Sequence, residues 1–256
     1  MARKKKKTNK KRIYMLDEIR GFAIICMIIH HAFLDVGDVL NLSWGYKVFD
    51  ALCTVQPLFW AIFIVISGMC SRLSRNTVKR GVIVLCFGII ITVFTAVIMP
   101  LFGFEGNEIY FGILHCLGSC MIITGLLMPL INKINYKVGA LISLLLFFFT
   151  YGVNTRTLCF GLIDLPSSLY QTNIFMPLGF YNYSFKSADY FSIIPWLFMF
   201  GAFFGKLAKD ENLPKTMYKQ RSKFLCFIGR NSLWVYILHQ PIIYAFMLLL
   251  ALILGL

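Results

Sequence analysis

The sequence predicts an all-α protein that crosses a membrane about seven times. Hydrophobic residues make up 59% of the 256 positions and charged residues only 14%. A soluble domain of this size would need more polar residues to cover its surface. The apolar residues gather in runs long enough to cross a hydrocarbon core of roughly 30 Å, which takes about 20 helical residues. The basic residues alternate between successive connections. Together these observations indicate a polytopic helical membrane protein.

Seven apolar runs are the expected transmembrane helices. Their approximate bounds are 16–36, 48–71, 81–101, 109–131, 138–153, 190–207 and 231–254. The fifth run is short and its ends are poorly marked. We divide the chain into a basic cytoplasmic tail at 1–15 and a single transmembrane domain at 16–256, which carries a long outer loop at 154–189.

The distribution of basic residues predicts the orientation. Of the 25 Lys and Arg residues, 22 lie on one side of this arrangement, and only Lys47, Arg156 and Lys186 lie on the other. Because cytoplasmic loops are enriched in Lys and Arg, the N-terminus is expected in the cytoplasm and the C-terminus outside. The net charge of +14 is then a topology signal with attraction to anionic lipid headgroups, and we expect no nucleic-acid partner.

The eight cysteines show no metal-binding or disulfide pattern, and we expect no metal site. Cys116 and Cys120 lie one helical turn apart inside a span, where such residues usually serve as small apolar packing groups. Cys53 and Cys159 both lie toward the expected outer side, so a disulfide between them stays open.

The first helix carries the clearest functional signal. Arg20 lies near its entrance, and His30 and His31 lie far along it. An ionisable group in hydrocarbon costs several kcal/mol unless it is paired or faces a wet cavity. Arg20 and His31 are 11 residues apart, so on a helix they share one face, within about 20°, at roughly 16 Å along the axis. That face would present a cation at the inner surface and an imidazole toward the outer one.

All four histidines fall inside expected spans. A single histidine in a span is usually structural and bonded to a neighbouring helix, but four of four favour a shared function. His31, His115 and His239 are the candidate catalytic bases, because an imidazole with a pKa near 6.5 suits proton transfer at neutral pH. We favour His31.

Basic and aromatic residues mark two further candidate surfaces. Arg72, Arg75 and Arg80 follow the second span, where they serve either as topology determinants or, with Arg20, as a rim that binds phosphates, since guanidinium groups hold phosphates bidentately. The connection 154–189 mixes tyrosines with amide side chains. Such surfaces bind carbohydrates, so we interpret this loop as a lid on the acceptor side.

Four stretches resemble, in the same order, signatures of the heparan-alpha-glucosaminide N-acetyltransferase catalytic-domain family. They read LDEIRGFAIICMIIHHAF, IYFGILHCLG, YFSIIPWLFMFGAFFGK and FIGRNSLWVYILHQPIIY. The Arg-x10-His spacing of Arg20 and His31 is also similar to that of the broader membrane-bound acyltransferases of cell-surface glycans. The resemblance implies an acetyltransferase that moves an acetyl group from cytosolic acetyl-CoA to a sugar amine or hydroxyl across the membrane.

The resemblance also implies a set of site residues. It points to Asp17, Arg20, His31, His115, Asn231, Ser232, His239 and Gln240. Asn231, Ser232 or Gln240 could donate to a developing oxyanion, and His30 is an extra imidazole that the motif does not explain. Animal lysosomal members have a proposed catalytic histidine in the first outer loop, whereas residues 36–50 contain none. Neither that histidine intermediate nor the heparan acceptor is therefore carried over.

The partners implied are acetyl-CoA, a sugar or glycolipid acceptor and membrane lipids, in a bacterial plasma membrane. A homo-oligomer stays open. The alternative function is a transporter or flippase of a small polar or lipid-linked substrate, because intramembrane histidines and a proline-broken helix also occur in transporters. No inverted repeat relates the two halves. A scaffold or sensor would explain the helices but not the placement of Arg20 and the histidines.

Overall fold

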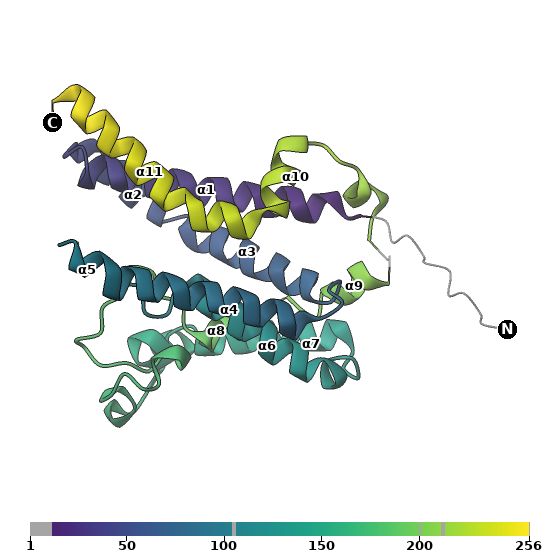
Figure 1. The fold of residues 1–256 in the computed structure, drawn as a ribbon. Helices are drawn as coiled ribbons and strands as arrows, with labels where there is room; N and C mark the ends of the chain where they lie inside the picture. Colours follow the sequence, from purple (N-terminus) through teal and green to yellow (C-terminus); the bar gives the residue numbers. More distant parts are fainter. Residues whose placement is uncertain (1–11, 104–105, 200, 211–212, 256) are drawn as a thin grey trace. The chain divides into compact units, whose positions relative to one another are not determined.

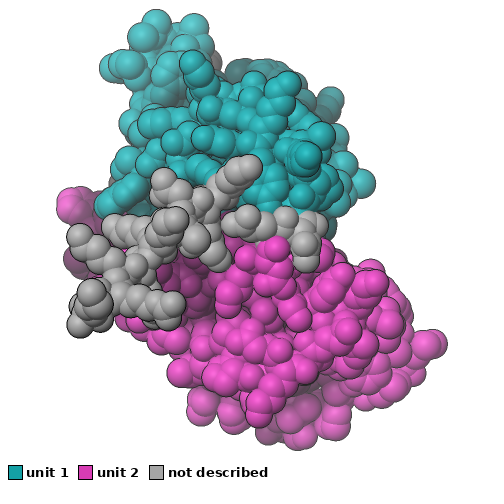
Figure 2. Space-filling view, turned by 90° about the vertical axis from the view of Figure 1, so that its right-hand side faces the viewer, with its two compact units in different colours: residues 1–63, 212–256 teal, residues 64–211 magenta. Residues whose placement is uncertain are grey.

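The fold comes from a computed structural model that describes residues 12–103, 106–199, 201–210 and 213–255. Most of the predicted tail at 1–15 therefore lies outside the described residues. The chain divides into two compact units, Met1–Phe63 with Asn212–Leu256 and Ile64–Glu211, which Figure 2 shows in different colours. Each unit is described by itself. The single transmembrane domain expected at 16–256 stays a prediction.

The first unit is built around one long helix, α1 (Tyr14–Asp38). The helices α2 (Ser43–Cys53), α10 (Lys223–Arg230) and α11 (Ser232–Leu254) pack against it, as Figure 1 shows. A short 3-10 helix, η6 (Lys215–Tyr218), also contacts α1. The helix α3 (Gln56–Ser71) belongs to this unit up to Phe63. Segments from both ends of the chain thus surround α1.

The second unit has α4 and α6 as its closest helix pair. The helix α4 (Thr77–Val93) continues through a π-helical turn, η1 (Phe94–Ile98), into α5 (Met99–Leu101). It packs along α6 (Ile113–Ile131), while α7 (Tyr136–Thr150) packs on the short helix α8 (Ile193–Met199). The last helix of the unit is α9 (Gly205–Lys209).

The outer loop of the second unit consists of short segments. Its 3-10 turns are η2 (Val153–Thr155), η3 (Cys159–Gly161), η4 (Ser167–Tyr170) and η5 (Met176–Leu178). Its two strands, β1 (Thr157–Leu158) and β2 (Ile163–Asp164), pair antiparallel with Thr157 opposite Asp164.

Five helical segments of the described chain are long and apolar enough to span a membrane. They are Tyr14–Asp38, Thr77–Leu101, Ile113–Ile131, Tyr136–Thr155 and Ser232–Leu254. The pair of α2 and α3, bent by 55°, brings the number to six if it counts as one broken span. The expected all-α membrane protein is thus confirmed, while the count of seven and the orientation stay predictions.

The single helix expected at 190–207 is not found as one continuous helix in the structure. It contains two short helices, α8 and α9, and Phe200 between them lies outside the described residues. Ile194 is extended, with φ −95° and ψ 126°. A residue that precedes proline is disfavoured in the helical region, so Pro195 interrupts the helix near its start.

Candidate functional site

A polar cluster in the first unit joins α1 to α11. The rings of His31 and His239 have centroids 5.2 Å apart. One turn beyond His31, the Asp35 carboxylate is only 3% exposed and accepts two hydrogen bonds from Gln240 Nε2, at 3.0 and 3.1 Å. The cluster therefore combines two imidazoles, a carboxylate and an amide between two apolar helices.

Two atoms of this cluster are acceptors without a partner. His239 Nδ1 donates to the carbonyl of Tyr236, so a neutral His239 ring has its lone pair on Nε2. Gln240 uses its amino group for Asp35, which leaves Oε1 as an acceptor. Within the described part of the chain, His239 Nε2 and Gln240 Oε1 are buried and have no hydrogen-bond partner. Buried acceptors of this kind, here on two consecutive residues, suit a ligand N–H or O–H group.

The sequence reasoning missed Asp35, although a signal was present. Asp35 follows His31 by four residues, which places both on one face of a helix. Its partner Gln240 is 205 positions away, so only the fold could reveal the contact. Because Gln240 Nε2 is taken by Asp35, the atom that Gln240 presents is an acceptor rather than the oxyanion donor considered from the sequence.

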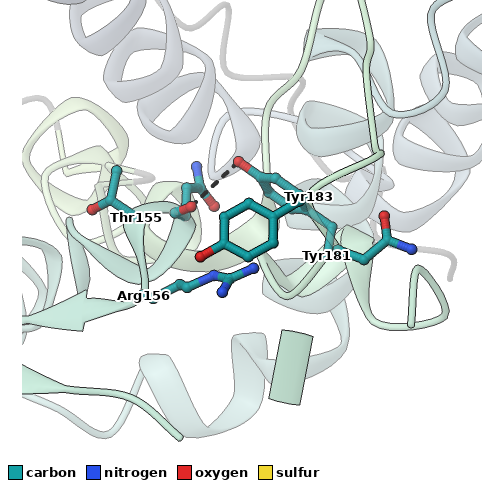
Figure 3. A pocket seen from close by; sticks show the side chains of 6 residues that line it. Thr155, Arg156, Tyr181 and Tyr183 are labelled. Atoms are coloured by element: carbon teal, nitrogen blue, oxygen red, sulfur yellow. Dashed lines mark hydrogen bonds between the residues drawn. The ribbon is translucent and has the colours of Figure 1, made fainter. Parts of the chain in front are cut away.

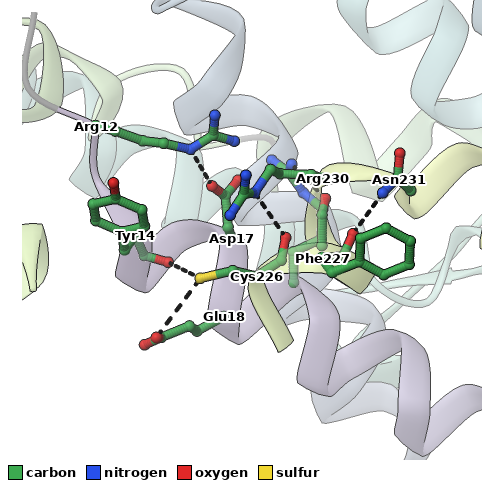
Figure 4. Close-up of polar contacts among 10 residues, drawn as sticks. Arg12, Tyr14, Asp17, Glu18, Cys226, Phe227, Arg230 and Asn231 are labelled. Atoms are coloured by element: carbon green, nitrogen blue, oxygen red, sulfur yellow. Dashed lines mark hydrogen bonds and ion pairs between the residues drawn. The ribbon is translucent and has the colours of Figure 1, made fainter. Parts of the chain in front are cut away.

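The N-terminal end of α1 is held to α10 by Glu18, which was not among the site residues expected from the sequence. Its Oε1 accepts the backbone N–H groups of Arg221 at 2.6 Å and Ser222 at 2.8 Å. The Cys226 thiol lies 3.7 Å from the same oxygen, as Figure 4 shows. Glu18 is 7% exposed and satisfies free N–H groups at the start of α10. It thereby docks α10 on α1.

The other motif residues of this end lie at the same helix crossing. Asp17 forms an ion pair of 2.8 Å with Arg12, and Arg20 Nη1 donates to the carbonyl of Gly229 at 3.3 Å. Glycine is required at the crossing, since a Cβ at Gly229 would overlap the carbonyl of Asp17. The charged entrance of the first motif therefore joins α1 to α10, in addition to any role toward a substrate.

Asn231 and Ser232 lie at the junction of α10 and α11. Asn231 Nδ2 donates to the Phe227 carbonyl at 2.9 Å, and Ser232 is the first residue of α11. Seven helical residues separate Ser232 from His239, which amounts to about 10 Å along the axis. Of the residues expected to support the site in the last helix, the structure brings Gln240 to the imidazoles and leaves Asn231 and Ser232 apart.

His30 faces a different set of neighbours from His31. Its ring contacts Cys53, Gln56 and Phe49, from α2 and α3. The rings of His30 and His31 lie 5.7 Å apart, edge to face. The two consecutive imidazoles therefore serve two distinct environments on α1.

His115 is in the second unit, where both of its ring nitrogens have partners. Nδ1 accepts the backbone N–H of Gly112 at 3.2 Å, and Nε2 lies 3.2 Å from Thr92 Oγ1. The Thr92 hydroxyl donates to the Ile109 carbonyl at 2.7 Å, so His115 Nε2 is the donor to Thr92. His115 thus joins α6 to α4 within the second unit, whereas His31 belongs to the first unit.

The three arginines after α3 differ in exposure. Arg72 is buried and donates from Nη1 to Asn132 Oδ1 at 2.9 Å, whereas Arg75 and Arg80 are exposed. Arg75 and Arg80 are therefore the residues of this rim that a phosphate group can reach from solvent. Arg20 belongs to the other unit.

The outer loop contains a cavity of about 250 Å³. It is lined by Asn154, Thr155, Arg156, Tyr181, Asn182 and Tyr183. Figure 3 shows the Arg156 guanidinium against the face of Tyr183, 3.6 Å from the ring centroid. Burial raises the pKa of Tyr181, so its hydroxyl stays protonated and donates to the Asn154 carbonyl at 3.4 Å. The cavity is thus lined by aromatic and amide side chains, and the acceptor-side lid stays a prediction.

Neither a metal cluster nor a disulfide is found among the described residues. No group of three or more His, Cys, Asp or Glu side chains there could hold a metal ion. Cys53 and Cys159 are free thiols in different units, and the disulfide left open by the sequence stays open.

The apolar helices define a polytopic membrane protein, and a buried polar cluster joins two of them, α1 and α11. The sequence model of the family described as heparan-alpha-glucosaminide N-acetyltransferase, catalytic, matches residues 12–241. The chain belongs to this family. The match includes every candidate site residue and supports a transmembrane acetyltransferase. Comparisons with curated proteins and with solved structures found no match.

Proposed function

We propose that the protein transfers an acetyl group from cytosolic acetyl-CoA to an amine or hydroxyl of a sugar-containing acceptor on the outer side of the membrane. Family membership supports the acetyl transfer. The observation that supports the site is the pair of unpartnered acceptors, His239 Nε2 and Gln240 Oε1, beside His31 and Asp35. They are placed to receive the hydrogen atoms of an attacking amine or hydroxyl.

The donor substrate enters from the cytoplasm in this proposal. The candidate phosphate-binding residues are Arg20 in the first unit and the exposed Arg75 and Arg80 in the second, and the pantetheine arm extends along α1. The helix is unbroken from Tyr14 to Asp38, so Arg20 and His31 are roughly 16 Å apart along its axis. That length is comparable to the reach of a pantetheine arm, and the thioester would arrive near His31.

An imidazole of the cluster then accepts the proton of the acceptor group. The sequence favours His31. His239 is a second candidate base, because its Nε2 lone pair has no hydrogen-bond partner among the described residues. The acceptor nitrogen or oxygen attacks the carbonyl of the acetyl thioester, the carbon–sulfur bond of that thioester breaks, and the thiolate leaves. Asp35, through Gln240, positions the amide oxygen beside the base. General base catalysis contributes typically 10² to 10⁴-fold in rate.

Labelled acetyl-CoA supplied to inside-out vesicles tests this function. Glucosamine is added as the acceptor probe. An enzyme of the proposed kind leaves the acetyl label on glucosamine or on a glycan or lipid acceptor of the vesicles. His239→Gln keeps a polar side chain but removes the base, and should lower the labelling about 100-fold. Transport of label without any acetylated product would favour the transporter or flippase instead.

A further inference from the structure

His30, which the family motif does not explain, is held in place by three side chains. It is 5% exposed. Its Nε2 lies 3.4 Å from Cys53 Sγ, and its Nδ1 lies 3.3 Å from Gln56 Nε2. The ring packs on Phe49, with centroids 4.3 Å apart. A thiol, an imidazole and an amide thus form one hydrogen-bonded row.

The break between α2 and α3 creates this row. Cys53 is the last residue of α2 and Gln56 is the first residue of α3, and the two helices meet at 55°. Both side chains contact the same imidazole on α1, Cys53 at Nε2 and Gln56 at Nδ1.

The amide of Gln56 lets His30 act as a base toward Cys53. For the Cys53 thiol to donate to Nε2, Nδ1 must carry the other proton and donate it to an acceptor. Gln56 supplies that acceptor when its amide is turned to present Oε1, because the oxygen and nitrogen of an amide are interchangeable in position. A nucleophile within hydrogen-bond reach of a base, itself oriented by a third group, is the signature of covalent catalysis.

We propose that Cys53 accepts the acetyl group as a thioester before it passes to the acceptor, with His30 as its base and Gln56 as the residue that orients His30. This inference rests on the proposed function.

The covalent step balances without any further reactant. His30 Nε2 takes the proton of the Cys53 thiol as Sγ attacks the acetyl carbonyl carbon. The carbon–sulfur bond to the coenzyme breaks, and the coenzyme thiolate takes the proton back from His30. One thioester is exchanged for another. The acceptor amine or hydroxyl then attacks the acetyl-Cys53 carbonyl and restores the thiol.

The acetylated thiol would lie next to the cluster that activates the acceptor. The ring centroid of His30 is 5.7 Å from that of His31, which in turn is 5.2 Å from that of His239. One imidazole can therefore serve the thiol while the next two serve the acceptor. This arrangement assigns separate roles to two consecutive histidines.

The test is acetylation of the purified full-length protein by acetyl-CoA in the absence of an acceptor, measured by mass spectrometry of peptides. The expected result is one acetyl group on Cys53, released by hydroxylamine and by added glucosamine. Cys53→Ala should lose the modification and lower transfer to glucosamine about 100-fold or more. Cys86→Ala is the matched control, because Cys86 is an exposed thiol on α4.

Two further variants separate a catalytic row from a packing contact. His30→Gln should slow acetylation of Cys53 about 100-fold while leaving the reaction of Cys86 with a maleimide unchanged. Gln56→Glu keeps an acceptor for Nδ1–H and should retain acetylation, whereas Gln56→Leu should reduce it. Equal rates in Gln56→Leu and Gln56→Glu would overturn the role of Gln56.

The outcomes distinguish this inference from the proposed function. If the wild type acetylates glucosamine and Cys53→Ala does so at the same rate, the function stands and the thioester is overturned. An acetyl group found on a histidine rather than on Cys53 also overturns it. If the wild type neither acetylates glucosamine nor becomes acetylated on Cys53, both proposals fail.

Discussion

Replacement of Glu18 tests how the entrance of the first helix works. Glu18→Ala removes the acceptor of two backbone N–H groups, those of Arg221 and Ser222, from a site that is almost closed to water. A hydrogen bond to a charged group contributes about 1.5–3 kcal/mol, so loss of both should cost about 3–6 kcal/mol. Glu18→Gln keeps an acceptor oxygen without the charge and should cost about half as much.

The assay is hydrogen exchange of the backbone amides at the start of α10. Local opening controls exchange in such segments, and 3 kcal/mol corresponds to a rate increase of about 100-fold or more. Asp17→Asn is the control, because its ion pair with the exposed Arg12 is worth at most about 1 kcal/mol. Equal exchange in Glu18→Ala and the wild type would refute the docking of α10 by Glu18.

Three further predictions concern the same helix. His31→Ala should abolish acetyl transfer while the protein is still expressed and purified as a folded species, and near-native turnover would place the base elsewhere. Arg20→Ala should weaken acetyl-CoA binding in calorimetry, and unchanged affinity would remove Arg20 from the donor site. Gly229→Ala should lower the thermal unfolding temperature, since the added methyl group meets the Asp17 carbonyl. Overpacking of this kind costs typically about 1–3 kcal/mol. An unchanged unfolding midpoint would show that α1 and α10 can move apart at no cost.

Hydropathy predicted the long helices well. The runs at 16–36, 81–101 and 231–254 correspond to segments that begin within four residues of the expected starts. Length and apolar composition are enough for such helices, because the bilayer demands internal backbone hydrogen bonds. Breaks are harder to predict, since the bend between α2 and α3 depends on what the two helices pack against.

The candidate site was partly visible in the sequence. Arg20 and His31 could be placed on one face because they belong to a single helix. Contacts between helices could not be predicted. Gln240 reaches Asp35 across 205 residues, and His115 is hydrogen-bonded within its own unit. Helical periodicity orders residues along one element but does not identify contacts between elements.

A structure of the full-length protein with a non-hydrolysable acetyl-CoA analogue tests the central claim most directly. The proposal predicts phosphate density at Arg20, with the acetyl carbon beside the imidazoles of His31 and His239. Coenzyme density confined to the outer surface, or histidine rings turned away from the acetyl group toward lipid, would contradict it.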